Sequence, residues 1–167
     1  MISVFTPKLT PRIDYAVRFI FESILLDEVQ FYTQPEAFQN APGVRINYSA
    51  ETIPNCYTVV PRNLLLESHL EMQKMEAFTW GKHTVFFRVK NSDLPFDIFA
   101  ASFFLVSRYE EYLPAKRDHY NRYRGKYSTA FLLNFLEKPQ IDCWAQSLAQ
   151  ELSERFEGYT FKKRHFN

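Results

Sequence analysis

The ionisable side chains with the best chance of sharing one site lie in the segment 108–112, Arg-Tyr-Glu-Glu-Tyr. On a helix, Arg108 and Glu111 are neighbours at i, i+3. Two carboxylates perform acid–base chemistry only when both reach one pocket, whereas Glu110 and Glu111, adjacent on a helix, point ~100° apart. An enzyme centred on Arg108, Glu110 and Glu111 is therefore one hypothesis. A half-buried ion pair that ends a core helix and anchors the next loop is the alternative that the pattern favours.

The second candidate is the basic loop 114–127, which carries five cationic side chains against Asp118 alone. Its cations alternate with tyrosines, a mixture that binds anionic polymers or stacks on sugars and bases. The contacts expected there are Arg122, Tyr123 and Arg124. A solvated charged loop is the favoured alternative, because runs of one charge sign usually face water. If the loop does bind a partner, we expect a glycan or another polyanion.

Other signatures of chemistry are missing from the sequence. No His-x-x-x-His or His-Glu-x-x-His spacing occurs among the four histidines, His69, His83, His119 and His165. Cys56 and Cys143 are spaced neither as zinc ligands nor as a disulfide framework. No nucleophile-elbow, Walker A or dinucleotide motif occurs, and four glycines leave little material for a phosphate loop. We therefore expect this chain to bind no cofactor and no metal, although a triad scattered along the chain would leave no such trace.

The composition is typical of one folded domain, which we expect to span residues 1–167. Apolar residues make up 46% of the chain and charged residues 23%, which excludes a disordered or fibrous protein. A net charge of +1 provides no field that would attract nucleic acid. The N-terminus lacks a signal-peptide pattern, and no apolar run approaches the ~20 residues that span a bilayer. We expect a cytoplasmic protein without a membrane span.

Hydrophobic periodicity predicts three main helices, at 10–24, 96–113 and 139–158, with a short further segment at 128–136. Thr10 is a good N-cap for the first helix, and Pro11 fits the first helical position because its missing N–H would be unbonded there. The second helix is apolar around nearly its whole circumference, as expected of a helix buried in the domain, and Pro114 ends it.

Short β-prone runs predict strands at 2–5, 29–32, 44–48 and 57–60, and a hairpin of 77–80 with 84–89. Together with the three helices, they predict an α/β fold. We expect a single domain with a mixed β-sheet of about five or six short strands and three main helices packed on it.

The strings Ser-Asp-Leu-Pro-Phe-Asp at 92–97 and Ser-Arg-Tyr-Glu-Glu-Tyr-Leu-Pro at 107–114 carry a family resemblance. The chain resembles the N-terminal domain that precedes the catalytic domain in a group of bacterial polysaccharide-deacetylase-like proteins. The likeness covers nearly all 167 residues. It departs from the family at Ile98, where a proline is expected, and the loop 117–127 matches only loosely. Further matching strings lie in order along the chain at 4–7, 10–12, 46–49 and 139–144.

The resemblance implies that the deacetylase chemistry belongs to a downstream domain with a paired-Asp motif and a His-x-x-x-His metal site. Neither motif is present in this chain, so no catalytic residue is carried over, and the divalent metal would belong to the downstream domain. We therefore expect a non-catalytic accessory domain, with the native chain continuing beyond Asn167 into its partner domain. An independent glycan- or polyanion-binding module that uses the loop 114–127 is the alternative.

Overall fold

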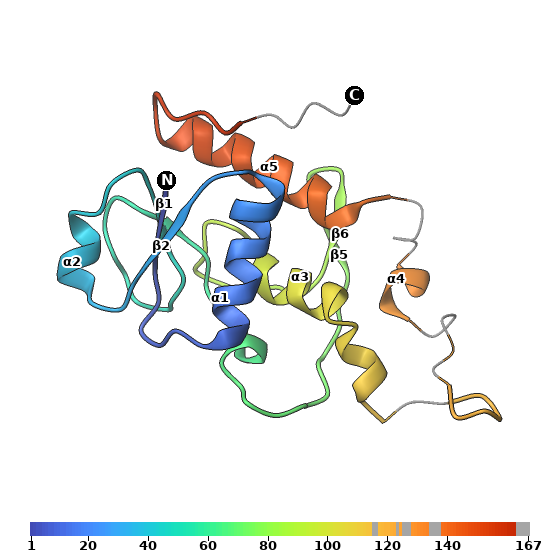
Figure 1. Cartoon of the computed structure of the whole chain (residues 1–167). Helices are drawn as coiled ribbons and strands as arrows, with labels where there is room; N and C mark the ends of the chain where they lie inside the picture. The colour runs from blue at the N-terminus through green and yellow to red at the C-terminus, as the bar shows by residue number, and fades with distance from the viewer. Residues whose placement is uncertain (115–116, 123, 125–127, 134–137, 163–167) are drawn as a thin grey trace.

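The main sheet of the computed structural model is parallel, with strand order β2-β1-β3-β4. Figure 1 shows two of these strands, β1 and β2, side by side. The structure describes residues 1–114, 117–122, 124, 128–133 and 138–162. All of β1 is buried, as required of a strand that is covered on both faces of the sheet. The strands are β1 (Ile2–Phe5), β2 (Val29–Tyr32), β3 (Val44–Asn47) and β4 (Tyr57–Thr58).

Two further strands, β5 (Phe78–Trp80) and β6 (His83–Val85), form a separate antiparallel hairpin. Its two-residue turn contains Gly81, whose φ of 57° suits the left-handed position that such turns require. The α/β class is confirmed. The strands do not join in one mixed sheet, however, because the hairpin strands pair locally with each other and the parallel strands pair across crossovers.

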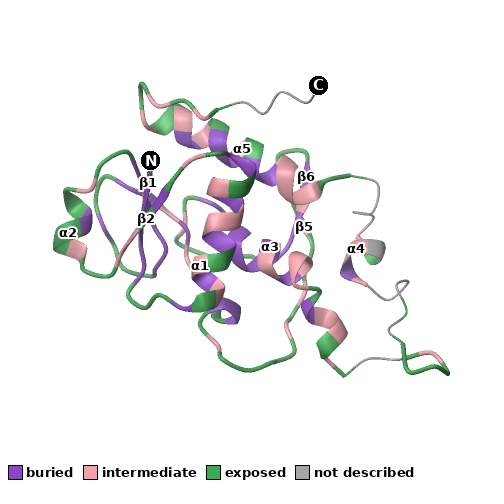
Figure 2. Ribbon diagram, viewed as in Figure 1, coloured by how far each residue is buried: buried purple, intermediate pink, exposed green. Residues whose placement is uncertain are grey.

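The two faces of the sheet are covered by different helices. On one face, Ile2 and Val4 belong to a large core shared with α1 (Pro11–Arg18), its π-helical continuation η1 (Phe19–Ile24), α3 (Ile98–Val106) and α5 (Gln140–Arg155). On the other face, Phe5 packs in a small cluster with Phe38 of α2 (Pro35–Gln39). Figure 2 shows the buried residues following β1 and one side of α1 and α5.

The predicted start of the first helix is confirmed. The Thr10 side chain accepts a hydrogen bond from the backbone N–H of Ile13 at 3.1 Å, and Pro11 occupies the first turn. The short helices α2 and η2 (Asn63–Leu65) were not predicted. Of the predicted segment 128–136, the structure forms α4 (Thr129–Leu132), and 134–136 lie outside the described residues.

The expected single helix over 96–113 is wrong. Helix α3 begins after its N-cap Asp97 and ends at Val106, and a separate 3₁₀ helix, η3 (Tyr109–Tyr112), follows. Between them, Arg108 adopts a left-handed conformation with φ of 52°, which interrupts the helical path. Within the described ranges, no helix is both long and apolar enough to cross a bilayer.

Asp97 joins three segments of the chain through a fully buried carboxylate. One oxygen caps α3 by accepting the backbone N–H groups of Phe99 at 3.1 Å and Ala100 at 3.0 Å. The other accepts the Tyr48 hydroxyl and the Arg62 backbone N–H, each at 2.7 Å. These four donors offset part of the desolvation of the carboxylate.

Ser92 and Asp93 bond to backbone groups at the outer edge of β4, which no further strand among the described residues covers. Asp93 accepts the Thr58 backbone N–H at 2.7 Å, and the Ser92 hydroxyl accepts the Val60 backbone N–H at 3.0 Å. The Ser92 hydroxyl also donates to the Thr58 carbonyl at 3.2 Å. These side chains close the strand edge and fix the chain that leads to Asp97.

Burial raises the pKa of Asp97 from 3.8 to about 6, although its hydrogen bonds act in the opposite direction. Because the folded value lies above the unfolded value, protonation favours the folded state. The contribution of this group to stability is therefore largest below pH 3.8, falls as the pH rises to about 6, and is constant above that.

We expect Asp97→Asn to destabilise the domain by about 2–4 kcal/mol. An amide replaces one acceptor oxygen with an NH₂ group, so backbone N–H groups that Asp97 now accepts would lose their partner. Tyr48→Phe removes one donor only and should lose about 1 kcal/mol. Urea unfolding at pH 7 measures both effects. A stability of Asp97→Asn equal to that of the wild type would contradict this role.

Candidate functional site

Of the three side chains considered as one candidate site, Arg108 and Glu111 pair with each other, as the favoured ion-pair alternative predicts, and Glu110 has a different partner. Glu110 turns to the start of α4, where it accepts the Thr129 backbone N–H at 2.8 Å and the Thr129 hydroxyl at 2.7 Å. The two carboxylates therefore do not meet in one pocket, and each holds a different part of the chain.

Tyr109, between these charged residues, anchors the segment. It is buried, its ring packs on Phe104, and its hydroxyl accepts the backbone N–H of Glu71 at 2.8 Å. The Arg12 guanidinium lies 5.7 Å from the centre of the Tyr109 ring and 5.7 Å from that of Phe103. These contacts hold η3 against α1 and explain why the chain turns at Arg108 instead of continuing α3.

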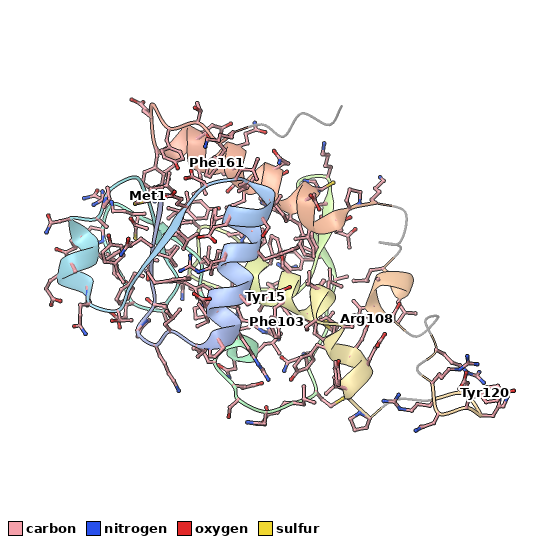
Figure 3. All side chains as sticks on the ribbon, in the orientation of Figure 1. Met1, Tyr15, Phe103, Arg108, Tyr120 and Phe161 are labelled. Atoms are coloured by element: carbon pink, nitrogen blue, oxygen red, sulfur yellow. The ribbon has the colours of Figure 1, made fainter. Side chains whose placement is uncertain are left out.

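The predicted basic loop is only partly described. Tyr123 lies outside the described residues, as do Lys116, Lys126 and Tyr127. Arg122 and Arg124 are exposed, and Tyr120 lies at the end of a loop that projects from the domain (Figure 3).

Asp118 organises the described part of this loop. It accepts the backbone N–H groups of Tyr120 and Arg122 and pairs with the Arg122 guanidinium at 3.1 Å. The backbone hydrogen bond from Arg122 is the main cause that lowers the pKa of Asp118. The Arg122 guanidinium also lies 4.8 Å from the centre of the Tyr120 ring. The charge of Arg122 is thus locally compensated, while its planar group and the tyrosine ring stay exposed.

A histidine–serine pair that the sequence did not indicate joins the hairpin to α5. His83 Nε2 lies 2.7 Å from Ser147 Oγ, beside a hollow of about 270 Å³. Such a pair is the arrangement of a base and a nucleophile. Ser147, however, lies in the middle of α5, where backbone N–H groups bond to the preceding turn and none is free to stabilise an oxyanion. The 64 residues between the two leave no local sequence signal.

The other histidines have unrelated surroundings. His69 pairs with Glu71 at 2.5 Å on the surface, the His119 ring contacts Tyr120, and His165 lies outside the described residues. In the part of the chain that the structure describes, no group of three or more His, Cys, Asp or Glu side chains is arranged to hold a metal ion.

A polar hollow of about 520 Å³ opens where β3 and β4 end. Its lining comes from the loop after β3, from β4 and from the segment before α3: Ala50, Glu51, Thr52, Ile53, Thr58, Asn91, Ser92 and Asp93. Sequence analysis missed this hollow, because its walls lie about 40 residues apart and neither wall carries a known motif.

We expect Glu110→Gln to loosen the start of α4. The amide would retain one of the two oxygens that face Thr129, at a loss of about 0.5–2 kcal/mol of local stability. Hydrogen exchange of the Leu132 and Leu133 amides, which bond to the carbonyls of Ser128 and Thr129, measures the effect.

Glu111→Gln is the matched control for Glu110→Gln. It removes an ion pair whose arginine is 72% exposed and which makes no hydrogen bond to α4 among the described residues, and we expect little change in the hydrogen exchange of α4 from it. Equal exchange rates in both variants would contradict the anchoring role of Glu110.

Comparison with known proteins places the chain in a family without assigning an activity. No curated protein and no solved structure gives a significant match. The model of a family of unknown function, DUF7033, matches residues 2–157, which include every described element from β1 to α5. This match does not link the chain to polysaccharide deacetylases, so that resemblance stays a prediction. The chain belongs to DUF7033, a family of unknown function.

Proposed function

We propose that this chain is a non-catalytic accessory domain of a carbohydrate deacetylase, and that it positions or completes the site of a downstream metal-dependent domain. One observation carries the proposal. The ionisable side chains in the strings that resemble the deacetylase-associated domain form hydrogen bonds or ion pairs with other residues of this same domain. They are Asp93, Asp97, Arg108, Glu110 and Glu111.

A catalytic acid or base must exchange protons with a substrate. Asp97 is fully buried, and its two oxygens already accept four hydrogen bonds. Glu110 accepts bonds from Thr129, and Glu111 pairs with Arg108. In this proposal the residues of these strings stabilise the fold, and the reacting groups and the divalent metal belong to the downstream domain.

The surface through which the domain would act is formed by the rings of Tyr15, Phe19 and Phe103, called here the aromatic surface. Tyr15 is 47% exposed, stacks on Phe19 at 6.1 Å and meets Phe103 edge-on at 6.2 Å. Figure 3 shows Tyr15 and Phe103 side by side, on α1 and α3. Aromatic residues are enriched at the centres of protein interfaces, and the occupant that we propose is the downstream domain.

Sequencing the gene beyond the codon for Asn167 and assaying both forms of the protein tests this function. We expect the reading frame to continue into a paired-Asp motif and a His-x-x-x-His site. The full-length protein should release acetate from acetylated chitooligosaccharides with a divalent metal present, and purified 1–167 should release none. A stop codon after Asn167, or acetate release by 1–167 alone, would overturn the proposal.

Variants of the full-length protein then test the aromatic surface. Tyr15→Ala should lower acetate release about fivefold or more, because central aromatic contacts carry much of the binding energy of an interface. Leu132→Ala, which truncates another exposed apolar side chain, on α4 (Thr129–Leu132), is the control and should leave the activity unchanged. If the two variants have equal activity, the domain does not act through the aromatic surface.

A second candidate function, polyanionic glycan binding by the loop 114–127, is favoured by the exposed Arg122–Tyr120 contact. It predicts that a heparin oligosaccharide binds in a salt-dependent manner. Arg122→Ala/Arg124→Ala should make the slope of log K against log salt shallower by about one, because Asp118 already compensates the charge of Arg122. Lys8→Ala/Lys90→Ala, which removes two exposed cations elsewhere, is the control. An unchanged slope in the arginine variant would exclude this function.

A further inference from the structure

We propose that the hollow at the carboxyl ends of β3 and β4 binds a small polyhydroxylated molecule, neutral or cationic, through Glu51, Thr52 and Asn91. This inference does not depend on the accessory function, because it concerns a pocket that lies wholly within the described domain. The argument uses the position of the hollow, the rigidity of its two walls and the chemistry of its unbonded side chains.

The hollow lies at the edge of the sheet where α/β proteins hold their ligands. From β1 the chain passes through α1 to β2 at one side, and then through α2 on the opposite face to β3 at the other side of β1. In such doubly wound sheets, ligands bind outside the carboxyl ends of the strands, near the point where the strand order reverses. Here that point lies between β1 and β3, and the hollow lies at the same carboxyl edge one strand further along, between the loop that leaves β3 and the edge strand β4.

The wall after β3 is held by two buried polar side chains. Asn47 donates from Nδ2 to the Glu51 carbonyl at 2.7 Å. The Ser49 hydroxyl accepts the Glu51 backbone N–H at 3.1 Å and donates to Asn47 Oδ1 at 2.6 Å. Asn47 and Ser49 are both buried, so their side chains bond to the loop and not to solvent. The backbone at Glu51 is therefore held before any ligand binds, and its side chain projects from a fixed point of the chain.

The opposite wall is held to the edge of β4. Asn91 adopts a left-handed conformation with φ of 55°, which asparagine accepts more readily than most residues. The next two residues, Ser92 and Asp93, bond to the backbone of β4, and Arg155 of α5 donates to Asp93 at 3.0 Å. The backbone of both walls is thus held, and a ligand would have to order only the side chains that contact it.

Three side chains in the lining keep their hydrogen-bonding capacity. Those of Glu51, Thr52 and Asn91 make no hydrogen bond or ion pair with another residue in the described part of the chain, and all three are exposed. A carboxylate, a hydroxyl and a carboxamide together supply acceptors and donors, which is the combination that adjacent hydroxyl groups of a polyol require.

The charge of the site selects among such molecules. Glu51 contributes a free carboxylate, and the charge of Asp93 is compensated by Arg155. The lining is therefore negative, which disfavours phosphorylated or carboxylated ligands and favours neutral or amine-bearing ones. The volume of about 520 Å³ lies within the ~300–1,000 Å³ range of small-molecule sites.

The test is an NMR titration of the ¹⁵N-labelled protein with three probes at about 10 mM: glucosamine, glucose and glucose 6-phosphate. We expect glucosamine and glucose to shift the amide signals of 50–53 and 91–93, with glucosamine stronger, and glucose 6-phosphate to leave them unchanged. Absence of shifts with both uncharged and cationic probes, shifts confined to other residues, or stronger binding of glucose 6-phosphate would overturn the proposal.

Variants identify the group that recognises the ligand. Glu51→Gln should weaken glucosamine binding about tenfold, because a hydrogen bond to a charged group becomes a neutral one. Its side chain is exposed and unbonded, so the fold should be retained. Glu28→Gln is the matched control: Glu28 is an exposed glutamate directly before β2, at the amino edge of the same sheet, and its loss should not affect binding. Equal affinities of the two variants would contradict a role for Glu51.

Discussion

The buried carboxylate of Asp97 is the interaction on which the arrangement of the domain depends. It joins the start of α3 to Tyr48, directly after β3, and to the backbone at Arg62. An ionised carboxylate without partners would cost several kcal/mol in this position. All three segments must therefore come together for the fold to form. Burial still raises the pKa of Asp97 to about 6, so its hydrogen bonds only partly offset desolvation.

The same explanation extends to the strings that most resemble a functional motif. Ser92 and Asp93 close the edge of β4, Tyr109 anchors η3, and Glu110 holds the start of α4. Each of these polar side chains meets backbone groups that would otherwise be unsatisfied. A distinctive string of charged residues can thus serve to stabilise the fold. Binding groups are then better sought among exposed side chains that the fold does not use.

Two surfaces of the described residues remain as candidates for binding. The aromatic surface leaves Tyr15 of α1 half exposed beside Phe103 of α3, and the polar hollow leaves Glu51 unbonded at the carboxyl edge of the sheet. Their chemistries differ: stacked rings suit another protein surface, whereas a carboxylate with hydroxyl and amide neighbours suits a polyol. The two proposals are therefore independent, and each can fail without the other.

Local signals in the sequence determined the α/β class, most of the strands, the Thr10 cap of α1 and the apolar face of α5, because periodicity and capping act over a few residues. Tertiary structure decided the rest. The break of α3 at Arg108 reflects the anchoring of Tyr109 on Glu71, 38 residues away. Asp97 meets Tyr48 across 49 residues, and the walls of the hollow meet only when β3 and β4 pair. Contacts between residues so far apart in sequence leave no periodic pattern, since they are created by packing and not by neighbouring residues.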